Sequence, residues 1–235
     1  MKILGINALN HDAAVAMIQD GEVLFAGHSE RYSDIKNDSD LNKQLIADCF
    51  RYGKPDKVAY FERPYLKKLR QLRAGQYGEV LSTKNLPSNY LKQWIGKKPI
   101  HYVQHHQSHA AAAFYPSPFK EAVILCMDAV GEWATTSAWV GNGNKIKLLW
   151  EINFPHSLGL LYSAFTFYCG FKVNSGEYKL MGLAPYGKPI YSDLIEKKLI
   201  DIKEDGSFRL DQSYFDYSTG FKMTNEKFSK LFKKE

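Results

Sequence analysis

The sequence predicts an α/β fold, and three observations carry the prediction. Short apolar runs separated by turns predict a three-stranded β-meander over residues 2–28. Segments with helical apolar spacing or helix-favouring composition follow it. A second series of apolar runs and turns recurs over residues 122–152. With 45% hydrophobic and 14% aromatic residues, the 235-residue chain can bury a core, which excludes disorder as its main state.

The first meander consists of three apolar runs, at residues 2–7, 13–18 and 22–28. An Asp-Gly pair separates the second run from the third, and this dipeptide between apolar runs is a strong hairpin signal. A polar stretch separates the first two runs. The first turn of the meander is therefore expected to carry His11 and Asp12.

Between the two meanders the pattern predicts helices and two short strands. Residues 41–52 have helical apolar spacing and stop at a glycine. Residues 58–61 and 100–103 are strand candidates, and residues 64–98 look helical but weakly amphipathic. Four consecutive alanines favour a helix over residues 105–115, which two prolines end.

The net charge of +6 is concentrated in one segment. Nine basic residues and one acid lie between residues 63 and 98. Such a stripe with interleaved tyrosines could bind nucleic acid or phosphate. Because no base-reading motif accompanies the charge, we favour a solvated helical face or an insert that meets a partner.

The second meander repeats the order of the first. A fully apolar run at residues 122–127 predicts a buried strand, and a turn carrying Asp128 and Gly131 follows it. Two more strands are predicted at residues 135–140 and 145–152, on either side of a glycine-rich hairpin turn. We interpret this order as an internal structural repeat. Asp128, at the carboxyl end of its strand, is either a metal or phosphate-side acid or an Asx-type turn cap.

Two further patterns could carry chemistry. His105 and His109 stand four residues apart, which on a helix places both imidazoles on one face, close enough to bind one metal ion. Histidines placed there by chance are about as common. Residues 174–187 form a glycine-punctuated stretch that predicts a loop, in which Lys179 could neutralise phosphate and Gly182 permits close backbone approach. The ending of a Walker A motif is absent from this stretch.

Cysteine usage and apolar run lengths indicate an intracellular location. Cys49, Cys126 and Cys169 are odd in number and widely spaced, so we expect buried free thiols and no disulfide framework. No apolar run approaches the ~18 residues that a membrane-spanning helix needs, and the start does not resemble a signal peptide. We therefore expect a cytoplasmic protein without a membrane partner.

A β-meander followed by helices, given twice, resembles the layout of the actin-like ATPase superfamily; two unrelated subdomains that each begin with a hairpin are the alternative. Six motifs together closely resemble the NodU/CmcH carbamoyltransferase family. They are H-D-A-A (residues 11–14), S-E-R-Y (29–32), H-H-Q-S-H-A-A-A-A-F-Y-P-S-P-F (105–119), M-D-A-V-G-E-W-A-T-T (127–136), P-H-S-L-G-L-L-Y-S-A-F-T (155–166) and G-E-Y-K-L-M-G-L-A-P-Y-G (176–187).

The resemblance implies an actin-like (ASKHA, ribonuclease H-like) fold in two parts. Residues 1–120 would be the first subdomain, with a basic helical insert at about 63–98. Residues 121–235 would be the incomplete beginning of the second. In the family this domain transfers a carbamoyl group to an acceptor hydroxyl, and a second domain makes carbamoyl-adenylate from carbamoyl phosphate and ATP.

The resemblance also implies roles for particular residues. The family's divalent metal, which could be iron, manganese, zinc or magnesium, would be held by His105, His109 and Asp128. His11 is expected to act as the base that takes the proton of the hydroxyl, with Asp12 orienting it. The residues expected near the adenylate are Gly131, Glu132, Lys179 and Gly182.

Two departures from the family pattern leave alternatives open. Ala129 stands where the family usually has glycine. The family's second domain is missing from the chain, so we expect a second polypeptide or a C-terminal domain to be needed. The acceptor would be a small molecule such as a sugar, a natural product or a modified nucleotide. The alternatives are a non-catalytic nucleotide-binding or interaction module of the same fold, and threonylcarbamoyl transfer to tRNA.

Overall fold

The computed structural model describes residues 1–73, 75, 86–218 and 222–232. The chain folds into two compact units. Unit 1 comprises Met1–Leu72 and Tyr77–Ser108, and unit 2 comprises Arg73–Gln76 and His109–Glu235. Helices and strands are present in both, so the predicted α/β class is confirmed. In the described ranges no helix is long and apolar enough to span a membrane.

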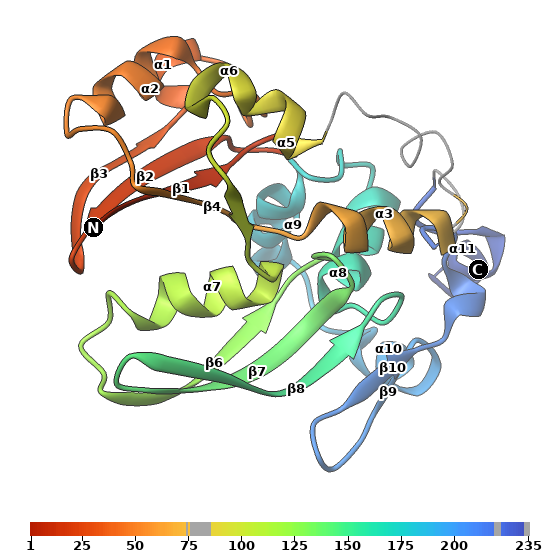
Figure 1. The fold of residues 1–235 in the computed structure, drawn as a ribbon. Helices are drawn as coiled ribbons and strands as arrows, with labels where there is room; N and C mark the ends of the chain where they lie inside the picture. The colour runs from red at the N-terminus through yellow and green to blue at the C-terminus, as the bar shows by residue number, and fades with distance from the viewer. Residues whose placement is uncertain (74, 76–85, 219–221, 233–235) are drawn as a thin grey trace. The chain divides into compact units, whose positions relative to one another are not determined.

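Unit 1 is built on a five-stranded mixed sheet with the order β3-β2-β1-β4-β5 (Figure 1). The meander is antiparallel and comprises β1 (Lys2–Asn7), β2 (Ala14–Gln19) and β3 (Glu22–His28). On the other edge of β1, β4 (Lys57–Tyr60) and β5 (Ile100–Tyr102) add in parallel. The strands predicted in this region are confirmed, and β1 is an inner strand.

Helices connect the strands of unit 1, and the core beside the sheet includes residues of α2 and α6. Helix α2 packs on β2 and β3, and the Asn42 side chain caps its first turn by accepting the N–H of Gln44 at 2.8 Å. Buried residues of α2 and the sheet form one core, which includes Leu4, Met17, Leu45, Val58 and Tyr60. The helices described here are α1 (Glu30–Ser33), α2 (Lys43–Phe50), α3 (Pro64–Arg73), α5 (Pro87–Tyr90) and α6 (Lys92–Ile95).

The basic segment 63–98 is helical in pieces where the structure describes it. Its central part, residues 74 and 76–85, lies outside the described residues. One of its lysines has a structural partner, because Lys67 Nζ lies 3.0 Å from the carboxylate of the buried Glu62. At least this part of the charge therefore serves the fold of unit 1.

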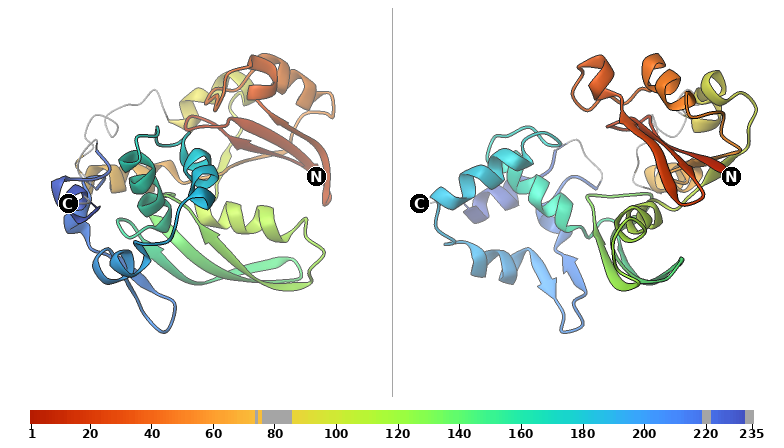
Figure 2. Two further views of the ribbon diagram at one scale, coloured as in Figure 1. Left: turned by 180° about the vertical axis from the view of Figure 1, so that it is seen from behind. Right: turned by 90° about the vertical axis from the view of Figure 1, so that its left-hand side faces the viewer.

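Unit 2 begins with a second antiparallel meander: β6 (Glu121–Met127), β7 (Ala134–Asn142) and β8 (Lys145–Asn153), in the order β6-β7-β8. Helix α7 (His105–Phe114) contains the division between the units and lies along one face of this sheet, as the right-hand view of Figure 2 shows. Its Ala110 and Phe114 pack on the sheet residues Ile124, Cys126 and Trp139.

One expectation about β6 is wrong. The run was expected to be fully buried, but only alternate residues are: Ile124 and Cys126 lie under α7. Val123, Leu125 and Met127 point to the other face and are 73%, 54% and 60% exposed. The apolar composition of the strand was recognised, but composition does not say which neighbours cover it.

The two meanders match in the length of their connections, which confirms the predicted repeat of elements. Residues 8–13 join β1 to β2, and residues 128–133 join β6 to β7, six residues in each case. Both second turns have two residues, at 20–21 and at 143–144. Counting along the strands, Ile3 of β1 corresponds to Val123 of β6.

The remainder of unit 2 packs around an aromatic cluster. Helix α8 contributes Phe165 and Tyr168, which meet Phe228 and Phe232 of α11 with ring centroids 5.2–5.9 Å apart. The elements are α8 (Leu158–Tyr168), α9 (Glu177–Leu183), η1 (Ala184–Tyr186), α10 (Ser192–Lys198), β9 (Ile200–Ile202), β10 (Phe208–Leu210), η2 (Gln212–Tyr214) and α11 (Glu226–Phe232).

Two predictions for this region need correction. Residues 174–187 were expected to be a loop, but Glu177–Leu183 forms α9 and Ala184–Tyr186 a 3₁₀ turn. Gly176 and Gly187 flank these elements, and Gly182 lies within α9 without breaking it. Cys169 is exposed, whereas Cys49 and Cys126 are buried free thiols as expected. Cys169 follows the last residue of α8, where the helix ends at the surface.

Candidate functional site

Helix α7 begins with the two predicted metal-binding histidines. His105 opens the helix and His109 lies one turn later on the same side. Of the four alanines that follow, Ala110 is fully buried in the contact with β6 and β7, whereas Ala112 and Ala113 are exposed. The continuous helix therefore fixes the spacing of the two imidazoles and their height above the sheet.

Asp128 follows the last residue of β6, and its backbone continues the pairing with β7. Its N–H donates to the carbonyl of Thr135 at 2.8 Å. One carboxylate oxygen, Oδ1, accepts the N–H of Ala129 at 2.7 Å, so this side chain does hold the turn. The other oxygen, Oδ2, lies 3.8 Å from Nε2 of His109. The two interpretations of Asp128 as turn residue and as metal ligand are compatible, since each uses a different oxygen.

The turn after β6 is fixed from behind by the start of α8. Ser157 donates from its hydroxyl to the carbonyls of Asp128 and Ala129, at 3.1 and 2.7 Å, and accepts the N–H of Leu160 as the helix cap. Gly159 lies so close that an added Cβ would be 2.7 Å from the Ala129 nitrogen and 2.8 Å from the Asp128 carbonyl. Only glycine permits this approach, so Gly159 positions the turn that carries Asp128.

His105, His109 and Asp128 form a candidate metal site. Ligand atoms of His105, His109 and Asp128 all lie within 4.8 Å of one another. Two atoms that bind one ion at about 2.1 Å each are at most about 4.2 Å apart, and the His109–Asp128 separation of 3.8 Å falls inside that limit. Two imidazoles and a carboxylate suit iron, manganese or zinc, and leave coordination positions for other ligands.

The turn between β1 and β2 in unit 1 carries the predicted catalytic pair. Nδ1 of His11 lies 2.7 Å from Oδ2 of Asp12. Asp12 has a positive φ of 53°, and the Asn7 side chain holds the turn by donating to the Asp12 carbonyl at 3.0 Å. The carboxylate thus fixes one ring nitrogen of the exposed His11 and leaves Nε2 on the other side of the ring.

Two residues near this turn were not predicted. Nε2 of His28 lies 3.5 Å from Oδ1 of Asp12, and ligand atoms of Asp12, His28 and Glu30 lie within 4.8 Å of one another. His28 ends β3, where it pairs with Ala14, two residues after Asp12. Regular pairing from the two-residue hairpin would place Gly27 opposite Ala14. A bulge between Met17 and Ile18 shifts the register by one residue and brings His28 there, so the hairpin signal alone does not predict its position.

The residues expected near an adenylate divide into two places. Gly131 closes the turn after β6 by donating its N–H to the Ala134 carbonyl at 3.0 Å. Glu132, in the same turn, is only 4% exposed. Lys179 and Gly182 lie on α9 and not on a loop, with Lys179 exposed beside the ring of Tyr178. The structure therefore groups Gly131 and Glu132 with Asp128, in the turn after β6.

Glu177, the first residue of α9, has a structural role that the sequence analysis did not assign. Its carboxylate accepts the backbone N–H groups of Asn174 and Gly176 at 3.0 and 3.1 Å, and the Ser163 hydroxyl at 2.9 Å. Burial tends to raise the pKa of this carboxyl, but the hydrogen bonds outweigh burial and lower it below its usual value. Glu177 thereby ties the start of α9 to α8.

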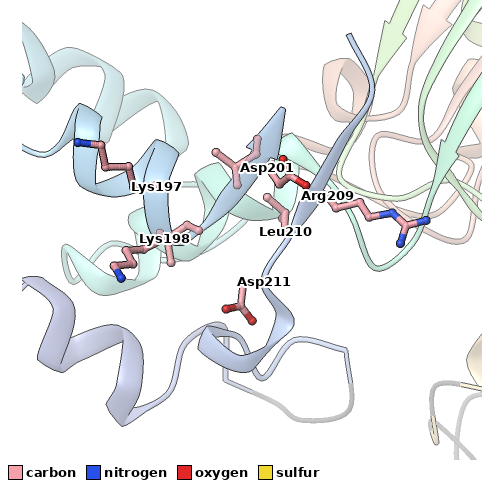
Figure 3. Close-up of a pocket in the computed structure, with 8 residues that line it drawn as sticks. Lys197, Lys198, Asp201, Arg209, Leu210 and Asp211 are labelled. Atoms are coloured by element: carbon pink, nitrogen blue, oxygen red, sulfur yellow. The ribbon is translucent and has the colours of Figure 1, made fainter. Parts of the chain in front are cut away.

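A hollow of about 300 Å³ lies elsewhere in unit 2, beside the β9–β10 hairpin (Figure 3). Lysines of α10, Arg209 of β10 and two aspartates line it. None of the predicted site residues is among its lining residues. Its three cationic side chains exceed its two carboxylates by only one charge, and it holds no predicted site residue, so we do not connect this hollow with the predicted reaction.

Comparisons with known proteins give the family. The family model described as "Carbamoyltransferase N-terminus" matches residues 57–235. The uncharacterized protein sll1178 of Synechocystis sp. is 47% identical over 98% of this chain and 42% of its own length. The nodulation protein NolNO of Sinorhizobium fredii is 34% identical over 87% of the chain and 32% of its own length. The chain therefore spans less than half the length of these relatives.

Similarity to solved structures is weak. The Aquifex aeolicus PPX-GPPA enzyme aligns with 18% identity and a TM-score of 0.34, over 80% of this chain and 65% of that one. A similarity at this level carries no argument about fold or function. The sequence match is decisive by itself, since it covers most of the chain and includes both the α7 histidines and the turn after β6. The chain belongs to the carbamoyltransferase family and matches the N-terminal region of that family.

Proposed function

We propose that this chain is the acceptor-side part of a carbamoyltransferase, which moves a carbamoyl group from carbamoyl-adenylate to a hydroxyl of a small molecule. The observation that carries the proposal is the group of His105, His109 and Asp128, in which a helix and a strand end bring three candidate metal ligands within 4.8 Å. Family membership supports a transferase. The three candidate metal ligands support a catalytically active protein over a non-catalytic module of the same fold.

In the proposed transfer, one bond to the carbamoyl carbon forms and another bond to that carbon breaks. The acceptor oxygen attacks the carbamoyl carbon, the bond from that carbon to the phosphate oxygen breaks, and AMP leaves. Nε2 of His11 takes the proton of the hydroxyl, while Asp12 holds Nδ1 and stabilises the imidazolium that forms. His28, on the other oxygen of Asp12, would keep that carboxylate oriented.

The metal, when bound by His105, His109 and Asp128, would supply positive charge as a Lewis acid beside the adenylate phosphate. The residues around it have separate roles in the proposal. Gly159 and Ser157 keep the Asp128 turn in place, and Gly131 closes that turn. Lys179 would neutralise phosphate from the exposed side of α9.

The proposal includes an actin-like arrangement and a further polypeptide part. The repeated meander supports the first, because each unit begins with the same strands and turns. The lengths of the relatives support the second: a C-terminal domain or separate chain would make carbamoyl-adenylate from carbamoyl phosphate and ATP. A non-catalytic module of the same fold would need no metal, so metal content separates the two functions.

The test is metal binding followed by turnover. We expect the purified chain to bind close to one equivalent of divalent metal, and His109→Ala to weaken binding about 100-fold or more. His101→Ala is the matched control, because His101 is an exposed histidine on β5. AMP release and carbamoyl transfer are then measured with the C-terminal part of the Synechocystis relative added. Metal binding that is equal in all three proteins, or absent from the unaltered chain, would overturn the proposal.

A further inference from the structure

We propose that a hollow in unit 1, lined by residues of α3, α5, α6 and β5 and of the loop before β5, binds a free nucleoside phosphate. The hollow has a volume of about 400 Å³, which lies in the range of small-molecule sites. Its described lining includes none of the residues expected at the metal, at the catalytic turn or beside the adenylate. The inference is therefore separate from the proposed function, and each can fail without the other.

Three lysines gather at the hollow because the chain turns there. Lys92 is the first residue of α6, and Gly96, with a φ of 65°, ends this helix. Glycine adopts this left-handed conformation without strain. The chain then passes through Lys97 and Lys98 into β5. All three lysines are exposed and line the hollow, so ammonium groups from both sides of the turn can reach one bound anion.

The positive charge of this wall is not compensated by a carboxylate. Aspartate and glutamate are absent from the lining residues that the structure describes. Within the described ranges the three lysines form no ion pair, unlike Lys67, which pairs with Glu62 at 3.0 Å. The hollow beside the β9–β10 hairpin differs, since two aspartates line it. Three ammonium groups around one hollow attract a phosphate, whose oxygens can accept a hydrogen bond from each.

Much of the remaining lining is aromatic or aliphatic. Tyr65 and Tyr102 contribute rings, and the ring of Tyr102 packs against buried Tyr60 at a centroid distance of 6.0 Å. Ile95 and Ile100 contribute side chains that belong to the core of unit 1 or pack against it. Aromatic rings stack on nucleobases of any identity. An inorganic phosphate would leave this apolar surface exposed to water, so the lining favours a phosphate that carries a flat ring.

A free nucleotide suits this surface better than a nucleic acid chain. Binding a chain requires a row of cations that follows its backbone. The basic residues of α3 do not extend such a row, because Lys67 pairs with Glu62, while Lys68 and Arg70 have contacts of their own. In the described part of the basic segment, the lysines without an ion pair therefore gather at one hollow of small-molecule size.

The probe is AMP, titrated by calorimetry into the purified chain in the presence of EDTA. Removing divalent metal ensures that a metal at His105, His109 and Asp128 does not contribute to binding. We expect saturable binding of one AMP per chain. Adenosine lacks the phosphate and ribose 5-phosphate lacks the base, so each should bind about tenfold or more weakly than AMP.

Variants of the lining test the location. Lys97→Gln combined with Lys98→Gln removes two charges from the wall and should weaken AMP binding about tenfold or more. The matched control combines Lys54→Gln with Lys57→Gln, since both are exposed lysines of unit 1 outside the lining. This control should change AMP binding less than about twofold.

A further variant tests the aromatic part of the lining. Tyr65→Ala should weaken AMP binding about fivefold or more and leave the binding of ribose 5-phosphate unchanged, because only AMP has a base to stack on the ring. Tyr65 is 66% exposed, so its replacement should keep the thermal stability of the unaltered chain.

Four results would overturn the inference. They are absence of saturable AMP binding, ribose 5-phosphate that binds as tightly as AMP, equal AMP binding by the Lys97 and Lys98 variant and the unaltered chain, and an equal loss in the control pair. A ten-nucleotide single-stranded RNA that binds through the same lysines more tightly than AMP would assign the hollow to nucleic acid instead.

The same titrations separate this inference from the proposed function. In EDTA, His109→Ala should bind AMP as the unaltered chain does. Loss of AMP binding in His109→Ala, with binding kept in the Lys97 and Lys98 variant, would contradict this inference and support the proposed function. A chain that binds AMP at the hollow but binds no metal would contradict the proposed function and leave this inference standing.

Discussion

The two meanders have the same connections but different surroundings. Both have a six-residue first turn and a two-residue second turn. In unit 1 the first strand is enclosed by β2, β4 and helix cover, and Leu4 is fully buried. In unit 2 the first strand has cover from α7 on one face, while Leu125 on the other is 54% exposed. Local sequence thus sets the meander, and distant segments decide what is buried.

The first turns of the two meanders also differ in where they place a carboxylate. Counting from the preceding strand, Asp12 in unit 1 corresponds to Glu132 in unit 2. Asp12 is partly exposed and pairs with His11, whereas Glu132 is 4% exposed. The metal-ligand candidate of the second turn, Asp128, stands four positions earlier, directly at the strand end. The same connection length therefore presents a carboxylate at different points of the turn.

The largest expected effect tests the difference in burial between the two first strands. Leu4→Ala should lower the free energy of unfolding by about 2 to 5 kcal/mol, because it leaves a cavity in the core of unit 1. Leu125→Ala, the same change on β6, should alter it by less than about 0.5 kcal/mol in the isolated chain. Urea unfolding followed by circular dichroism measures both. A loss above about 2 kcal/mol for Leu125→Ala would mean that its face is covered.

An intermediate effect is expected at the contact behind Asp128. The methyl group of Gly159→Ala would lie 2.7 Å from the Ala129 backbone, so the turn must shift. We expect a stability loss of about 1 to 3 kcal/mol and a metal affinity about 10- to 100-fold weaker. The affinity is measured by titration with Zn²⁺ or Mn²⁺.

Gly182→Ala is the control for this change, because an added Cβ at Gly182 meets nothing within 4 Å. On helix α9 the alanine should leave metal affinity unchanged and raise stability by up to about 1 kcal/mol. Equal metal affinity for both variants would show that the position of Asp128 does not depend on Gly159.

The strands and turns of both meanders and the helix with the two histidines could be predicted from sequence, because they depend on short-range patterns. Apolar runs separated by turn residues predicted both meanders, and the four-residue spacing predicted that His105 and His109 share a helix face. The approach of Asp128 to that face depends on α7 packing against β6. It was inferred only from the resemblance to the family, since no local pattern contains it.

What sequence reasoning missed depends on contacts made across the chain. The close approach of Gly159 to Ala129 joins positions 30 residues apart, and nothing in the local sequence distinguishes Gly159 from an ordinary helix glycine. Helix α9 was assigned to a loop because three glycines punctuate its region. The carboxylate of Glu177 accepts the backbone N–H groups of Asn174 and Gly176 just before the helix, a contact that the sequence analysis did not anticipate.

The smallest expected loss of stability comes from the contact that holds the start of α9. This helix lies outside the two meanders. Glu177→Gln keeps the size of the side chain but removes the charge that accepts two backbone N–H groups and one hydroxyl. At pH 7 the variant should be less stable by about 1 to 2 kcal/mol. Glu177→Asp is the control that keeps the charge but shortens the side chain.

The pH dependence of stability tests whether the charge of Glu177 causes this effect. The pKa of Glu177 is lower in the folded chain than its ordinary value of 4.5, so the folded state holds the proton less tightly than the unfolded state. The stabilisation is therefore complete above pH 4.5 and is lost as the pH falls through the folded pKa. The Gln variant does not titrate, so the stability difference between it and the unaltered chain should shrink below pH 4.5. A difference that stays constant from pH 7 to pH 3.5 would mean that the carboxylate charge does not hold the start of α9.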